Sequence, residues 1–135
     1  MNFLDTNTCI YYLNGKYPSI LEHFQNNSPS QIMIPSIVKA ELLYGVEKSQ
    51  RRIENRRTVQ QFLNAFQIAN FDSEAAVQYS TIRAQLENNG TPIGPNDVII
   101  ASIVLANKGI LITHNTKEFS RVEGLHLEDW VNVQS

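Results

Sequence analysis

Three acidic residues occupy positions where carboxylates can act together in chemistry. Asp5 directly follows the apolar pair Phe3-Leu4, and Asp97 opens an apolar segment after a Gly-Pro turn. Glu41 interrupts an otherwise apolar helical pattern. Carboxylates that cluster repel one another unless a cation neutralises them. If the fold gathers these three side chains, it is therefore expected to form a metal site.

Oxygen ligands of this type favour a hard divalent cation. Mg²⁺ and Mn²⁺ bind carboxylates, keep several waters and also bind phosphate oxygens. Such ions activate water and stabilise the charge that develops on a phosphoryl group. Phosphodiester hydrolysis is therefore the predicted chemistry, with one ion or with two.

Each acid also has a purely structural interpretation. Asp5 can cap a helix, Glu41 can be an exposed helix residue, and Asp97 can stabilise a helix N-terminus by about 0.3–1 kcal/mol. For any one acid alone, the structural role is favoured. The combination favours chemistry, because Asp5 and Asp97 both follow predicted turns on one side of the predicted sheet.

Short apolar runs alternate with helical patterns along the chain. Strands are predicted at 3–5, 32–34, 66–71, 110–113 and 125–127. Helices are predicted through 10–13, from 36 to 45, from 48 to 63, from 73 to 86 and from 98 to 106, with a short helical turn at 116–120. Ser36 and Ser73 are the expected N-caps, Pro35 is expected to stop the second strand, and Trp130 is expected to anchor the C-terminus.

Strands that alternate with helices imply right-handed crossovers and a parallel sheet between layers of helices. We therefore predict an α/β fold, a three-layer sandwich. In such folds ligands bind beyond the carboxyl ends of the strands, where the strand order reverses. If the first and fourth strands are neighbours, Asp5 meets the segment Thr113-His114-Asn115 at that point.

The chain has 135 residues, which predicts one domain spanning 1–135. Its net charge is only −2, so any nucleic-acid-binding surface must be local. Cys9 is the only cysteine, which excludes an intrachain disulfide, and it is expected in the core. The chain shows no signal peptide and no apolar run near the ~20 residues that span a bilayer, so a cytoplasmic protein without membrane contact is expected.

Several segments together resemble PIN-domain ribonucleases, and most closely the VapC-type toxins of bacterial toxin–antitoxin pairs. The resemblance covers nearly the whole chain and lies in segments 3–10, 40–49, 90–97, 112–119 and 122–130. It implies a central five-stranded parallel sheet and a Mg²⁺- or Mn²⁺-dependent endoribonuclease that inhibits translation.

The resemblance also implies roles for individual residues. Asp5, Glu41 and Asp97 correspond to the acidic triad, with Asp5 and Asp97 the strongest candidates for direct metal ligation. Thr6 corresponds to a hydroxyl that steadies the first acid. Many PIN domains carry a fourth acid in a Thr-x-Asp pattern; here Thr113 is followed by Asn115. This neutral residue argues against a second tightly held metal, and Glu118 is a candidate to help from nearby.

The same resemblance implies partners. A Gly-Thr-Pro-Ile-Gly-Pro segment before the third acid is similar to that of enzymes that cut the anticodon stem-loop of initiator tRNA. VapC-like toxins form homodimers, and a VapB-type antitoxin inhibits them with an apolar segment laid in a groove. Tyr11, Tyr12, Leu43 and Tyr44 are candidates to line such a groove, or else are ordinary core residues.

Three further alternatives stay open. The basic stretch of Lys48, Arg51, Arg52, Arg56 and Arg57 can grip RNA phosphates, but a solvated helix face that pairs with Glu47 and Glu54 is favoured. A non-catalytic binding module on the same scaffold is the alternative function. A deoxyribonuclease is a third, less favoured possibility.

Overall fold

A computed structural model describes residues 1–131. Within these residues, five strands form one sheet in which every pairing is parallel. The strands are β1 (Asn2–Leu4), β2 (Ile32–Pro35), β3 (Gln67–Ala69), β4 (Ile110–Ile112) and β5 (His126–Glu128), in the spatial order β3-β2-β1-β4-β5. The predicted α/β fold with a five-stranded parallel sheet is therefore confirmed.

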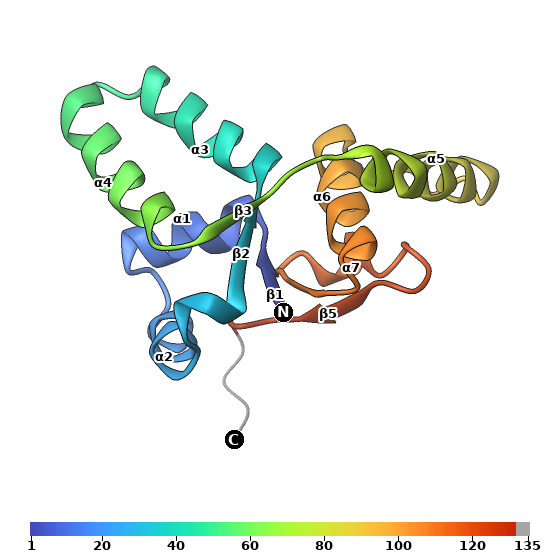
Figure 1. The fold of residues 1–135 in the computed structure, drawn as a ribbon, viewed down its shortest axis with the longest axis horizontal. Coiled ribbons are helices and arrows are strands. Elements are labelled where there is room, and N and C mark those ends of the chain that lie inside the picture. The colour runs from blue at the N-terminus through green and yellow to red at the C-terminus, as the bar shows by residue number, and fades with distance from the viewer. Residues whose placement is uncertain (132–135) are drawn as a thin grey trace.

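Seven α-helices and one 3₁₀ turn connect these strands in the described part of the chain. The helices are α1 (Thr6–Asn14), α2 (Pro18–Asn26), α3 (Ser36–Lys48), α4 (Arg52–Asn64), α5 (Ser73–Asn88), α6 (Pro95–Ala106) and α7 (Thr116–Phe119), and the 3₁₀ turn is Pro29–Gln31. Figure 1 shows the α3–α4 pair and the α5–α6 pair on opposite sides of the strands. Within residues 1–131, no helix is long and apolar enough to cross a bilayer.

The strand order reverses between β1 and β4. From β1 the chain builds outward to β2 and β3, then returns to place β4 and β5 on the other side. Phe3 pairs with Leu111, and Leu4 pairs with Ile112. The residues that follow Leu4 and Ile112 therefore lie side by side, at the place where such sheets bind ligands.

Strands β1 and β4 lie in the hydrophobic core. Phe3 and Leu4 are fully buried, as are Leu111 and Ile112 of the neighbouring strand. At Gly109 an added Cβ would lie 2.2 Å from a ring carbon of Phe3, so only glycine leaves room for that ring. Cys9 and Trp130 are also buried, as predicted.

Two predicted caps are wrong by one residue. Asp72, not Ser73, caps α5, and its Oδ1 accepts a 3.0 Å hydrogen bond from the Ala75 amide. Ser36 is the first residue of α3 rather than its cap. Its hydroxyl accepts a hydrogen bond from the backbone N–H of Phe71, in the segment between β3 and α5. Pro35 is the last residue of β2, so the strand ends there as predicted.

Three other features differ from the sequence prediction. The predicted helix over 48–63 begins later, at Arg52, because α3 continues to Lys48, after which the Ser49 hydroxyl donates to the Val46 carbonyl. The third strand is limited to Gln67–Ala69. Helix α2 was not predicted, although Pro18 in its first turn is a typical helix start.

Candidate active site

Asp5 lies at the junction of β1 and α1, where it has two structural partners. Its Oδ1 accepts a 2.9 Å hydrogen bond from the Thr8 amide and so caps α1. Its Oδ2 accepts a 2.6 Å hydrogen bond from the hydroxyl of Thr113, which directly follows β4. The capping interpretation is therefore correct, and the predicted meeting with Thr113 also occurs.

Burial sets the electrostatics of Asp5. Desolvation raises the pKa of this carboxyl, while the hydrogen bonds from Thr113 and Thr8 oppose the rise. The negative charge of Asp129 adds to it. A buried carboxylate that is fixed by two donors is rigid but poorly neutralised, because neither donor is a cation.

Glu41 is tied to the elements on either side of α3. Its Oε1 accepts a 2.6 Å hydrogen bond from the Thr6 hydroxyl in α1. Its Oε2 accepts a 3.4 Å hydrogen bond from the Asn96 side chain in α6. The expectation that Thr6 steadies Asp5 is therefore wrong: Thr6 holds Glu41, and Thr113 holds Asp5.

Asp97 lies in the first turn of α6, close to the other acids. The pKa of its carboxyl is raised to about 7, first by partial burial and next by the neighbouring Glu118. The charges of Asp5 and Glu41 raise it further. The carboxylates of Glu118, Asp5 and Glu41 therefore all raise the pKa of Asp97, as expected for one negatively charged cluster.

Glu118 joins the loop before α6 to the loop after β4. Its Oε1 accepts a 2.9 Å hydrogen bond from the Gly94 amide, and its Oε2 accepts a 2.5 Å hydrogen bond from the Asn115 side chain. The pKa of Glu118 is lowered, chiefly by the Gly94 amide. The backbone N–H of Asn115 donates a 3.0 Å hydrogen bond to the Thr113 hydroxyl. Glu118 is therefore linked to Asp5 through Asn115 and Thr113.

These side chains surround one small cavity of about 120 Å³. Its lining consists of Asp5, Thr6, Asn7, Glu41, Asp97, Asn115 and Phe119. The cavity thus brings together all three members of the predicted triad with Asn115 and Thr6, while Thr113 and Glu118 bond to its lining residues from outside it. No lysine or arginine is among the lining residues.

The donor set fits a hard divalent cation. Within residues 1–131, no three His, Cys, Asp or Glu side chains are placed closely enough to bind one ion directly. Mg²⁺ does not require three, because one or two carboxylates and several waters are its usual shell. A cavity lined by repelling carboxylates and neutral oxygen donors matches that requirement.

Sequence reasoning missed three contributors to the site. Asn96 contacts Glu41, and Asn7 and Phe119 line the cavity. Asn7 was visible beside Asp5 in the sequence, but the other two acquire a role only through pairing across the fold.

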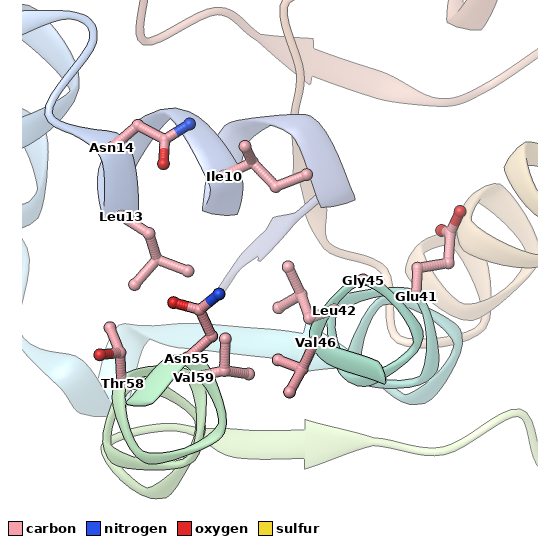
Figure 2. Close-up of a pocket in the computed structure, with 10 residues that line it drawn as sticks. All are labelled: Ile10, Leu13, Asn14, Glu41, Leu42, Gly45, Val46, Asn55, Thr58 and Val59. Carbon is pink, nitrogen blue, oxygen red and sulfur yellow. The ribbon is translucent and has the colours of Figure 1, made fainter. Parts of the chain in front are cut away.

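A second, apolar cavity of about 300 Å³ lies between α1, α3 and α4, and we call it the apolar groove. Figure 2 shows Ile10 and Leu13 facing Leu42, Val46 and Val59 across it. Glu41 lines both this groove and the acidic cavity, so the two adjoin.

The four candidates for the lining of an apolar groove lie elsewhere. Tyr11, Tyr12 and Leu43 pack against the hydrophobic core, and Tyr44 is 63% exposed outside the groove. These three side chains are half-buried, so the core interpretation is correct for the part of each that packs inward.

The basic stretch forms the solvated face that the sequence favoured. Arg56 pairs with Glu47, and Arg51 lies 3.7 Å from Glu54. All four side chains are more than half exposed, so each pair contributes little stability.

Comparison with known proteins agrees with this geometry. The PIN domain matches residues 3–125. The chain is 39% identical over 127 residues to the tRNA(fMet)-specific endonuclease VapC of Salmonella typhimurium, covering 94% of this chain and 96% of the relative. It is 41% identical over 130 residues to ribonuclease VapC2 of Rickettsia felis, with the same coverage.

Solved structures give the same result. The VapBC2 complex of Rickettsia felis bound to a DNA fragment from its promoter contains a chain that matches with a TM-score of 0.90 and 38% identity, covering 96% of this chain and 98% of that one. The DNA-bound VapBC of Salmonella typhimurium matches with a TM-score of 0.91 and 38% identity, covering 96% and 97%. The chain belongs to the PIN-domain family and, within it, to the VapC ribonucleases.

Proposed function

We propose that this chain is a Mg²⁺- or Mn²⁺-dependent endoribonuclease toxin that inhibits translation by cutting RNA. The observation that carries the proposal is the convergence of Asp5, Glu41 and Asp97 on one cavity that no cationic side chain lines. Each acid comes from a different element, so their proximity is a property of the fold rather than of local sequence. A cation, or a proton held by one of the acids, makes such a cluster tolerable at neutral pH.

In this proposal Asp5 and Asp97 hold the ion, and Glu41 completes the acidic lining. A bound Mg²⁺ or Mn²⁺ supplies an activated water and neutralises charge on the phosphoryl group. Thr113 and Thr8 fix the orientation of Asp5. Asn115 donates its amide N–H to Glu118, which leaves its amide oxygen to face substrate or water.

We propose that the substrate is initiator tRNA, cut in its anticodon stem-loop. The support is the 39% identity to the tRNA(fMet)-specific endonuclease VapC of Salmonella typhimurium. A cavity of about 120 Å³ is far smaller than a tRNA stem-loop. The choice of RNA must therefore depend on surfaces around the cavity.

We propose that a VapB-type antitoxin occupies the apolar groove of α1, α3 and α4. The solved relatives are VapBC complexes. The groove ends at Glu41, so a segment seated there can direct a basic side chain toward the acidic cavity. We also propose that the chain acts as one nuclease domain, as a homodimer, in the cytoplasm.

Cleavage of initiator tRNA tests the enzymatic proposal. Purified protein is expected to cut the tRNA in Mg²⁺ or Mn²⁺, and both EDTA and Asp5→Asn are expected to abolish cutting. Asp72→Asn is the matched control, since Asp72 caps α5 as Asp5 caps α1 but lies outside the cavity. If Asp5→Asn cuts as well as wild type, the proposed active site is wrong.

The second candidate is a non-catalytic binding module. Asn115 supports it, because this position carries an acid in many PIN domains and supplies no charge here. Such a module binds RNA without cutting it in any divalent metal. Comparing RNA with DNA of the same sequence in the cleavage assay tests the deoxyribonuclease alternative.

A further inference from the structure

Three rings and one ammonium group gather beside the acidic cavity. Lys16 Nζ lies 5.1 Å from the ring centre of Tyr11 and 5.3 Å from that of Tyr17. The His114 ring lies 6.5 Å from Tyr11 and 6.2 Å from Tyr17, and the two tyrosine rings meet edge to face at 5.0 Å. We call Tyr11, Lys16, Tyr17 and His114 the ring patch.

The histidine of the ring patch is held in one orientation. Its Nδ1 lies 2.9 Å from Oδ2 of Asp129, whose Oδ1 accepts a 2.9 Å hydrogen bond from the Val131 amide. The Asp129 side chain is 12% exposed, whereas that of His114 is 43% exposed. The ring of His114 is therefore anchored on its Nδ1 side and open to solvent elsewhere.

The ring patch adjoins the acidic cavity along the chain at His114. His114 lies between Thr113, which holds Asp5, and Asn115, which lines the cavity. Neighbouring Cα atoms in a chain are about 3.8 Å apart, so the patch begins one residue from the cavity wall. Asp129, which anchors His114, also contributes to the raised pKa of Asp5.

The chemistry of the ring patch suits a nucleotide. The acidic cavity repels phosphates other than the one that a metal ion would bind, so RNA needs cations nearby. No ion pair within residues 1–131 involves Lys16, which leaves its charge available to a phosphate. Aromatic rings beside a cation are the usual receptor for an unstacked RNA base.

We propose that the ring patch binds the nucleotide adjacent to the scissile phosphate, with its base against the rings and its phosphate on Lys16. This inference rests on the proposed ribonuclease function and assigns a substrate contact to it. The patch touches no reacting atom, so it acts on substrate binding. Its loss is therefore expected to appear in KM more than in kcat.

The test measures KM and kcat for cleavage of an anticodon stem-loop RNA in Mn²⁺. Lys16→Met and Tyr17→Leu are each expected to raise KM at least about fivefold, the lower end for loss of one stacked base or phosphate contact, with kcat near the wild-type value. Tyr17→Phe keeps the ring and is expected to match wild type. This conservative variant separates loss of the ring from loss of the hydroxyl, and the melting temperature of Tyr17→Leu reports any damage to the start of α2.

Lys48→Met is the matched control, because Lys48 Nζ also lies over a tyrosine ring, at 5.3 Å from Tyr44. It changes the net charge by the same amount but lies outside the ring patch. An equal loss in Lys48→Met would overturn the proposal, since RNA binding would then depend on overall charge or on the basic stretch rather than on the ring patch. Wild-type KM in both Lys16→Met and Tyr17→Leu would overturn it as well.

Binding of the same RNA to the Asp97→Asn protein, followed by fluorescence anisotropy, distinguishes this inference from the proposed function. The ring-patch variants are expected to raise Kd in that background at least about fivefold. If wild type cuts no RNA, the ribonuclease proposal fails while the anisotropy still tests the patch. If wild type cuts RNA and the patch variants bind normally, the patch fails alone.

Discussion

The hydroxyl of Thr113 donates a 2.6 Å hydrogen bond to Oδ2 of Asp5, joining two residues 108 positions apart. The bond spans the β1–β4 boundary, where the strand order reverses. Both side chains are buried. Thr113 also accepts from the Asn115 amide, so one hydroxyl fixes two residues at the cavity.

Thr113→Val is expected to impair both stability and activity. Valine has a similar shape but no hydroxyl, so Asp5 and the Asn115 amide each lose a partner. Leaving a buried polar group unsatisfied costs about 1–3 kcal/mol of unfolding free energy. Because partners that orient metal ligands affect affinity about 10–100-fold, RNA cleavage is expected to fall in that range.

Denaturant unfolding and initial cleavage rates measure these two effects. Thr81→Val is the control, because the Thr81 hydroxyl bonds only to the Val77 carbonyl on the exposed side of α5. Cleavage by Thr113→Val at the wild-type rate would show that Asp5 needs no support from β4.

The metal-free protein is expected to lose stability as the pH rises from about 5 to about 8. The pKa of Asp97 is raised to about 7 in the fold, above its ordinary value of 3.8. Between these values the folded state holds a proton that the unfolded chain has released, so the free energy of unfolding falls with rising pH. Thermal denaturation in EDTA across this range measures the trend.

Asp97→Asn and Glu118→Gln sharpen that experiment. Asparagine does not titrate, so Asp97→Asn is expected to flatten the pH dependence. Glu118→Gln removes the neighbouring charge that raises the pKa of Asp97 most. It is therefore expected to move the midpoint of the stability loss to lower pH. Identical profiles for all three proteins would contradict the assignment of the trend to Asp97.

Mn²⁺ is expected to raise the melting temperature of wild type by mass action. An ion that binds only the folded state at 100 times its Kd contributes about 2.7 kcal/mol. The stabilisation is expected to grow with pH, because the ion needs the deprotonated form of Asp97. Asp5→Asn should remove most of it and Asp72→Asn should retain it. The absence of any shift at millimolar Mn²⁺ would favour the binding-module alternative.

The sequence predicted the fold well where patterns are local. Short apolar runs located all five strands to within two residues at either end, and their alternation with helices implied the parallel sheet. The caps at Ser36 and Ser73 failed because an adjacent residue supplies the first non-helical position in each case. Helix α2 was missed, since its stability comes from packing of residues such as Ile20 on the core.

The site was predictable only in part. Asp5 and Asp97 are recognisable because each is an acid at the edge of an apolar element, and Glu41 because it interrupts an apolar helical pattern. The pairing of each hydroxyl with an acid depends on contacts between distant parts of the chain. Thr6 was therefore assigned to Asp5, although its hydroxyl donates to Glu41. The His114–Asp129 contact joins residues after two different strands and has no local sequence signal.

Gly109→Ala is expected to destabilise the sheet beneath the site. The added methyl group would lie 2.2 Å from one ring carbon of Phe3 and 2.5 Å from another, and the ring is fully buried. Overpacking of this kind costs about 1–3 kcal/mol. Gly45→Ala is the control, because its Cβ meets nothing within 4 Å and alanine in a helix is favoured by about 0.5–1 kcal/mol. Equilibrium denaturation of both variants is expected to show changes of opposite sign.

Gly45→Leu is expected to release the protein from its antitoxin without disabling it. Gly45 lines the apolar groove, and its Cβ direction is open, so a leucine side chain fills space that the proposed antitoxin segment needs. Binding of the VapB-type antitoxin is expected to weaken at least about tenfold, equivalent to about 1.4 kcal/mol. Calorimetric titration measures the affinity, and RNA cleavage with and without antitoxin measures inhibition. Tyr44→Leu introduces the same side chain at the neighbouring exposed position outside the groove and should keep wild-type inhibition. Full inhibition of Gly45→Leu by antitoxin would show that the antitoxin binds another surface.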